Sequence, residues 1–151
     1  MIRSTIRGLG LIAISAAAFS AATPAFAGQC PAGQERANAL SNHPTAPSMV
    51  TDDVIGSVDL GREIGVNGRD LRLRRLVVQP GGIVPYHSHQ GRPALIITVS
   101  GEITEFRSTC GVGIVHHAGE VAREADGISH YWVNEGNAPA ILLSADVKAQ
   151  D

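Results

Sequence analysis

GGIVPYHSHQGRPALIITVSG, residues 81–101, places two histidines two positions apart, shortly before an apolar run. Successive side chains of a β-strand point to opposite faces, so residues two apart share a face. His87 and His89 can therefore direct two imidazoles at one point, and a divalent transition metal ion is the most economical reason for this placement. Most such pairs in proteins are solvated or hydrogen-bonded, so the rest of the chain has to support the assignment.

From Val54 onward the sequence has the pattern of strands and turns. Leu71 and Leu73 alternate with arginines, which predicts a half-buried strand. Residues 94–99 form a nearly unbroken apolar run, which is typical of a strand covered on both faces. Glycine-containing turns separate these segments, and further short strands are expected over 102–106, 112–115, 128–133 and 138–145. Short strands at regular spacing predict an all-β barrel or sandwich.

A second pattern of glycine and histidine occurs in GEVAREADGISHYWVN, residues 119–134. Together the two stretches resemble the two sequence motifs of the cupin superfamily. Matches to the first motif are Gly81, His87, His89 and Gly101, and matches to the second are Gly119, Gly127, His130 and Asn134. Ala125 replaces the proline of the second motif. The resemblance covers residues 54–147 and implies a single-domain cupin, which is an all-β jelly-roll barrel (a double-stranded β-helix), with one divalent metal ion on His87, His89 and His130.

The first cupin motif has a metal-binding glutamate where this chain has Ala94. Three neutral imidazoles leave the charge of a divalent ion uncompensated, so the site should favour a small anionic ligand and keep open positions for substrate, water or dioxygen. Two alternatives stay open. In the first alternative, the barrel no longer binds a metal. In the second, another acid from a different strand completes the site, and the available acids are Glu102, Glu105, Glu120 and Glu124.

The resemblance also sets the expectations for cofactor and function. Some cupin dioxygenases use three-histidine iron sites, so iron is the expected ion, although zinc, nickel, manganese and copper also suit imidazole ligands. The expected function is that of an exported metal-dependent enzyme, a dioxygenase of a small anionic or enolisable compound, with lyase or isomerase chemistry fitting the same ion. The alternatives are a non-catalytic periplasmic protein that binds a metal or small ligand, and a metal-free sugar-binding or structural cupin.

Side chains beside the three histidines are candidates to line a substrate pocket. Trp132 lies two residues after His130 and should point the same way, into a pocket or into the core. Arg92 either binds a substrate anion or pairs with a nearby acid. The inward face of the next strand would carry Ala94, Ile96 and Thr98. The opposite face of this strand is wholly apolar and consists of Leu95, Ile97 and Val99. It must be covered by a second sheet layer or by a partner subunit. Because many cupins dimerise, we expect a homodimer.

The N-terminus has the features of a signal peptide. Arg3 and Arg7 precede an uncharged apolar segment, and Ala25-Phe26-Ala27 fits the small-x-small cleavage pattern. The predicted protein is therefore periplasmic or secreted, and its chain divides into a signal peptide over residues 1–27, an N-terminal arm over 28–50 and the cupin barrel over 51–148. Within the arm, residues 34–40 could form one or two helical turns.

Cysteine and charge usage restrict the environment and the partners. Cys30 and Cys110 are the two cysteines, and in an oxidising compartment they are expected to form a disulfide, with two separate thiols as the alternative. The formal net charge is −2, and Lys148 is the only lysine, so no basic run is present. We therefore expect a small-molecule ligand and neither nucleic acid nor a membrane as partner.

Overall fold

The described part of the protein is built almost entirely of β-strands. The structure is a computed structural model that describes residues 28–150, so the predicted signal peptide over residues 1–27 lies outside the described residues. The elements are β1 (Ser48–Asp59), α1 (Leu60–Ile64), β2 (Arg69–Ser88), β3 (Ala94–Ser100), β4 (Glu102–Arg107), β5 (Ile114–His117), β6 (Val121–Glu124), β7 (Ser129–Val133) and β8 (Ala140–Ala149).

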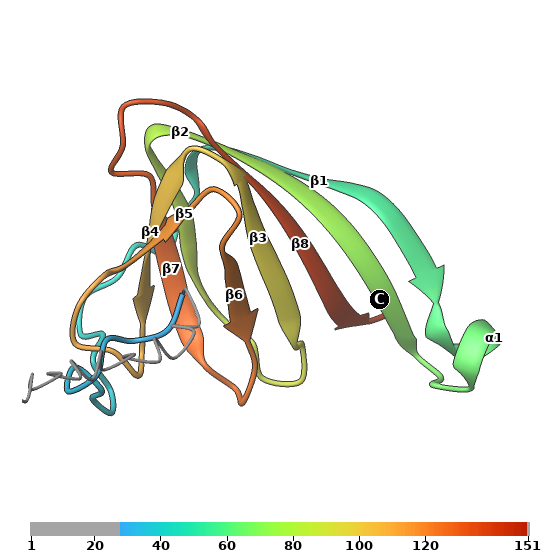
Figure 1. The fold of residues 1–151 in the computed structure, drawn as a ribbon. Helices are drawn as coiled ribbons and strands as arrows, with labels where there is room; N and C mark the ends of the chain where they lie inside the picture. The colour runs from blue at the N-terminus through green and yellow to red at the C-terminus, as the bar shows by residue number, and fades with distance from the viewer. Residues whose placement is uncertain (1–27, 151) are drawn as a thin grey trace, which may run out of the picture.

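The strands form one antiparallel sheet that curls into a nearly closed barrel (Figure 1). The hydrogen-bonded order is β5-β4-β7-β2-β8-β3-β6, and β1 pairs with β2 outside this path. This is an all-β jelly-roll barrel, so the fold class predicted from the sequence is confirmed. In Figure 1, parts of β1, β2 and β8 run beyond the barrel toward α1.

The long strand β2 belongs to both the extension and the barrel. Residues 69–78 of β2 pair with β8, and residues 83–88 pair with β7. Gly81 and Gly82 lie between these two parts. Gly81 has a φ of 75°, and a Cβ on Gly82 would lie 2.7 Å from two backbone oxygens. A side chain at either position would therefore disturb the crossing that brings His87 into the barrel.

The helix α1 has no counterpart in the sequence prediction, because its five residues are too few to show a helical period. Local capping defines it instead. The side chain of Asp59 accepts hydrogen bonds from the backbone N–H groups of Gly61 and Arg62, and Gly65 ends the helix with a φ of 76°.

Apolar side chains from six strands fill the barrel. Its buried core consists of Leu76, Val78, Ile96, Ile103, Ala122, Trp132, Ala140 and Leu142. Trp132 is the largest fully buried side chain of the described residues, with 1 % of its surface exposed. Burial of such side chains is the main stabilising contribution to a barrel of this size.

The alternating part of β2 turns its polar side inward. Leu71 and Leu73 are 42 % and 38 % exposed, whereas the side chains of Arg72 and Arg74 are only 16 % and 12 % exposed. Asp146 of β8 lies between the two arginines and compensates their charge. The alternation correctly predicts a strand with two different faces, but an ion-pair cluster occupies the inner one.

The N-terminal arm lies along the barrel without forming a helix, so the helical turns expected over residues 34–40 are wrong. Backbone hydrogen bonds join Gly111 N to Gln34 O and Arg36 N to Thr109 O, at 2.8 and 3.0 Å. Pairing with the segment after β4 therefore replaces pairing within a helix. The expected disulfide between Cys30 and Cys110 is present and fixes the arm to the same segment.

Candidate metal centre

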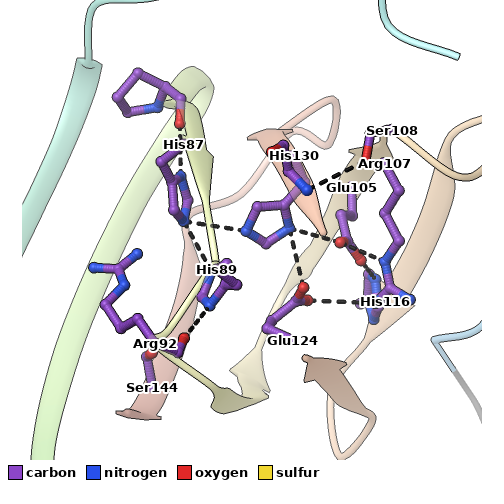
Figure 2. A network of polar contacts seen from close by, with 12 residues as sticks. His87, His89, Arg92, Glu105, Arg107, Ser108, His116, Glu124, His130 and Ser144 are labelled. Atoms are coloured by element: carbon purple, nitrogen blue, oxygen red, sulfur yellow. Dashed lines mark hydrogen bonds and ion pairs between the residues drawn. The ribbon is translucent and has the colours of Figure 1, made fainter. Parts of the chain in front are cut away.

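Three histidines from two neighbouring strands meet inside the barrel. His87 lies on β2 directly opposite His130 of β7, and His89 follows the end of β2. The Nε2 atom of His87 lies 3.1 Å from the Nε2 atoms of both His89 and His130 (Figure 2). His89 and His130 are buried, and His87 is partly buried. The structure thus brings together three imidazoles that are up to 43 residues apart in the chain.

The remaining ring nitrogen of each histidine donates a hydrogen bond away from this meeting point. Nδ1 of His87 lies 2.8 Å from the carbonyl oxygen of Pro85, and Nδ1 of His89 lies 2.8 Å from that of Arg92. A carbonyl oxygen can only accept, so Nδ1 carries the proton and Nε2 carries a lone pair. Nδ1 of His130 lies 2.6 Å from a carboxylate oxygen of Glu105.

Burial keeps these rings neutral. It lowers the pKa of His87 to about 3 and that of His89 to about 4, and it also lowers the pKa of His130. Three lone pairs consequently face one another at hydrogen-bond distance with no proton available to join them. A divalent transition metal ion can accept all three lone pairs, because imidazole nitrogen is one of its usual ligands. The three nitrogens lie within 4.8 Å of one another, close enough to bind the same ion. The residues present therefore fit a metal ion.

A second cluster of ionisable groups lies behind His130, on the side away from His87 (Figure 2). Glu105 of β4 accepts hydrogen bonds from His130, from Arg107 at 2.5 Å and from His116 at 2.9 Å. Burial alone would raise the pKa of Glu105, but these three hydrogen bonds hold it well below its usual range. Burial and the charge of Glu105 raise the pKa of Glu124 to about 9. At neutral pH Glu105 is therefore ionised and Glu124 is protonated.

The acids considered as replacements for Ala94 do not join the three Nε2 atoms. Glu105 and Glu124 reach His130 only at Nδ1, at 2.6 and 3.3 Å. Glu102 is exposed and lies 3.4 Å from His117, and Glu120 accepts from the backbone N–H of the same histidine. Among the described residues, the three histidines form one group of mutually close ligand atoms, and Glu105 and Glu124 form a second group with His130 on its Nδ1 side.

A cavity of about 200 Å³ opens beside His87. Of the residues predicted to line a pocket, Arg92, Ile96 and Trp132 lie in its wall. Ala94 and Thr98 are buried on the inner face of β3 but do not line this cavity. The ring of Trp132 packs 5.6 Å from that of His130 and 4.7 Å from that of His116, so it belongs both to the core and to the wall of the cavity.

The charged side chains in the wall of the cavity and beside it carry an excess of positive charge, and Arg74, Arg92 and Asp52 line the cavity itself. Asp146 accepts two hydrogen bonds from Arg72, at 3.0 and 2.7 Å, and lies 3.7 Å from both Arg74 and Arg92. Asp52 pairs with Arg74 at 2.5 Å. Three guanidinium groups thus face two carboxylates here. Burial and the nearby charge of Arg74 lower the pKa of Arg92, and Asp146 opposes this shift.

Several residues of the site were not predicted from the sequence. Arg74, Asp146 and the Glu105 cluster come from strands whose order in the sheet cannot be read from one chain. The signal that was available is the alternation of Arg72 and Arg74 with leucines, which we interpreted as the polar face of a half-buried strand.

Known proteins resemble this chain in both sequence and fold. The Cupin domain family matches residues 74–146. The auxin-binding protein ABP19b of Prunus persica is 33 % identical over 88 residues, and the match covers 52 % of this chain and 39 % of that protein. Nectarin-1 of Nicotiana langsdorffii x Nicotiana sanderae is 29 % identical over 105 residues, and the match covers 68 % of this chain and 46 % of that protein. The matches thus span less than half the length of these relatives.

Among solved structures, an oxalate oxidase in complex with the substrate analogue glycolate aligns with a TM-score of 0.52 and 21 % identity, over 70 % of this chain and 54 % of that chain. This likeness shows the fold. The match of the Cupin domain family over residues 74–146, together with the two sequence motifs, places the chain in the cupin superfamily. None of the helices in residues 28–150 combines the length and apolarity needed to span a membrane.

Proposed function

We propose that this protein is a metal-dependent cupin that binds one divalent transition metal ion on His87, His89 and His130 and a small anionic ligand beside it. The observation that carries the proposal is the convergence of three neutral Nε2 atoms, with distances of 3.1 Å from His87 to the other two. Two of these rings are oriented by backbone carbonyls, so their lone pairs point inward whether or not an ion is bound.

The charge of the surroundings supports an anion as ligand. The three metal ligands carry no negative charge, and the nearby guanidinium groups outnumber the carboxylates. Arg92 is the candidate group to hold the anion, because its ion pair with Asp146 at 3.7 Å is too long for a strong hydrogen bond. Ile96 and Trp132 form an apolar part of the wall and exclude water from that side.

A bound ion of this kind supplies Lewis-acid chemistry and, in the case of iron, chemistry with dioxygen. With iron as the ion, the proposed activity is that of a dioxygenase of a small anionic or enolisable substrate. The chain's own residues hold the ion, orient the anion through Arg92 and shield the site through Trp132. The second candidate function is binding without catalysis, which the small size of the cavity, about 200 Å³, also permits.

Metal analysis of the natively exported protein, purified without a polyhistidine tag, tests the centre. We expect about one equivalent of metal in the wild type and in His117→Ala, whose side chain is 63 % exposed and outside the centre. His87→Ala should lose the metal. Equal metal content in His87→Ala and the wild type would refute the assignment.

Two further measurements test the ligand and the activity. Arg92→Gln should weaken binding of small carboxylates to the metal-loaded protein by about 10- to 100-fold, the usual value of a hydrogen bond to a charged group. Arg123→Gln is the matched control, because this arginine is 65 % exposed and pairs only with Asp126. Oxygen uptake by iron-loaded protein over a panel of small acids and diketones separates a dioxygenase from a binding protein.

Homodimer formation is a further part of the proposal. Leu95, Ile97 and Val99 on the outer face of β3 are 55 %, 36 % and 48 % exposed, and Leu71 and Leu73 expose apolar surface on the same sheet. A second copy of the chain would cover this face. Sedimentation analysis should therefore show a dimer in the wild type and a monomer in Leu95→Glu, and a monomeric wild type would contradict this part.

Export and the division of the chain complete the proposal. The disulfide between Cys30 and Cys110 supports an oxidising compartment, because such bonds persist outside the cytosol. Under this proposal residues 1–27 are removed, residues 28–50 form the arm and residues 51–148 form the barrel. Cell fractionation with N-terminal sequencing of the recovered protein is the test, and a chain recovered from the cytosol with Met1 intact would contradict it.

A further inference from the structure

The three candidate metal ligands differ in what holds them. His87 and His89 donate their Nδ1 protons to neutral backbone carbonyls, each at 2.8 Å. His130 donates its Nδ1 proton at the shorter distance of 2.6 Å to a side chain, the carboxylate of Glu105. Charge-assisted hydrogen bonds are shorter and stronger than neutral ones. One imidazole of the three is therefore electronically different from the others.

Glu105 is fixed in place for this contact. It is fully buried on β4, which pairs directly with β7, the strand of His130. One carboxylate oxygen accepts from both His130 and Arg107, and the other accepts from His116 at 2.9 Å. These three hydrogen bonds fix the orientation of the carboxylate. Its position relative to His130 is consequently set by the sheet and by neighbouring side chains, and not by water.

Arg107 offsets the charge of Glu105 only in part. It contacts Glu105 at 2.5 Å and Glu124 at 3.3 Å, whereas the Nδ1 proton of His130 points directly at the carboxylate of Glu105 at 2.6 Å, so the charge nearest to His130 is the negative charge of Glu105. Glu124 lies 3.3 Å from Nδ1 of His130 on the same side as Glu105. His130 is thus bordered by acids at Nδ1 and by the other two histidines at Nε2 (Figure 2).

We infer that Glu105 is a positioning residue that supplies, through the imidazole of His130, the negative charge that a carboxylate at position 94 would otherwise bring to the metal. This inference rests on the proposed metal centre. A carboxylate behind a ligating imidazole fixes the ring and makes its ligating nitrogen more basic. The site therefore retains an open position where the glutamate of other cupins would bind the metal. Glu105, on the far side of His130, supplies part of the negative charge that this glutamate would bring.

Glu105→Gln removes the charge and keeps an oxygen that can accept from His130. Zinc and cobalt affinities are measured by competition with a chromogenic chelator for the wild type and the variant. Loss of a group that supports a metal ligand typically costs about 10- to 100-fold in affinity, and we expect a decrease in this range. The cobalt absorption spectrum should shift as well, because the ligand field of His130 changes, and a purely structural role would leave the spectrum unchanged.

Glu102→Gln is the matched control. Glu102 lies on the same strand, but its side chain is 51 % exposed and contacts His117 instead of His130. This variant should bind both metals as the wild type does. A wild type that binds no metal would refute the proposed metal centre itself. A wild type that binds metal, together with a folded Glu105→Gln variant of equal affinity and spectrum, would overturn only the role of Glu105.

A measurement on the wild type covers the case in which Glu105→Gln does not fold. In the zinc-loaded protein, the Nδ1 proton of His130 should resonate well downfield of those of His87 and His89, because it alone is shared with a carboxylate. Three similar Nδ1 proton shifts would overturn the inference. His87 and His89 serve as internal references, since both donate to backbone carbonyls.

Discussion

Removing the disulfide should strongly destabilise the protein without changing its native structure. Cys30 and Cys110 are separated by 80 residues, so the bond closes a long loop. In the chain-entropy description, closing a loop of this length raises the free energy of unfolding by roughly 4.5 kcal/mol, because it restricts the unfolded chain. We expect the folded arm to keep its backbone hydrogen bonds at Gln34 and Arg36 without the disulfide, because neither bond involves a cysteine. We therefore expect a loss of about 3–4.5 kcal/mol in the Cys30→Ala/Cys110→Ala double variant.

Equilibrium unfolding in guanidinium chloride, followed by circular dichroism, measures this loss. The dependence of the unfolding free energy on denaturant should also become steeper, because the unfolded chain without the cross-link exposes more surface. Wild-type protein reduced and kept reduced is the control, and it should match the double variant. Cys110 is buried, so agreement between the two also excludes an effect of the lost sulfur atoms. A loss below about 1 kcal/mol in both samples would refute the entropic reasoning.

Three substitutions test other features of the barrel. Trp132→Ala should lower the free energy of unfolding by about 3–5 kcal/mol, since the side chain is fully buried, and calorimetry would show it as a lower melting temperature. Asp146→Asn should destabilise the protein, because it removes the buried carboxylate that Arg72, Arg74 and Arg92 share, yet it should strengthen binding of small carboxylates in isothermal titration. Weaker carboxylate binding would contradict the assigned charge excess. Ala94→Glu should retain metal more strongly during dialysis against a chelator and bind anions more weakly, whereas unchanged anion affinity would contradict the charge argument.

The sequence predicts the fold well because the two cupin motifs include the parts of β2 and β7 that face each other and the turns beside them. The glycines of these motifs mark turns, and the histidines mark facing strands. The convergence of His87 and His130 follows from their direct pairing across β2 and β7, which the motifs imply. The short helix α1 was missed and a helix over residues 34–40 was wrongly expected. The helix α1 depends on local capping hydrogen bonds, and the arm depends on long-range pairing of Gln34 and Arg36 with the segment after β4; composition reveals neither.

The surroundings of the site were harder to predict. The inward orientation of Arg72 and Arg74 depends on Asp146, which lies 74 residues after Arg72, and no sequence pattern joins the two segments. Glu105 was one of four acids considered, and nothing in the chain distinguished it. Its role depends on the register of β4 against β7, which places Glu105 opposite Trp132 and Arg107 opposite His130. Registers between strands distant in sequence are tertiary information.

The different partners of the three imidazoles affect how this centre can change during evolution. The oxygens that orient His87 and His89 belong to the backbone of Pro85 and Arg92, and a point mutation at either residue leaves a carbonyl in place. The oxygen that orients His130 belongs to a side chain, which a single codon change replaces. Natural variation in metal selectivity among descendants of this gene is therefore expected to begin at position 105, since it is the least costly place to alter one ligand while the other two stay fixed.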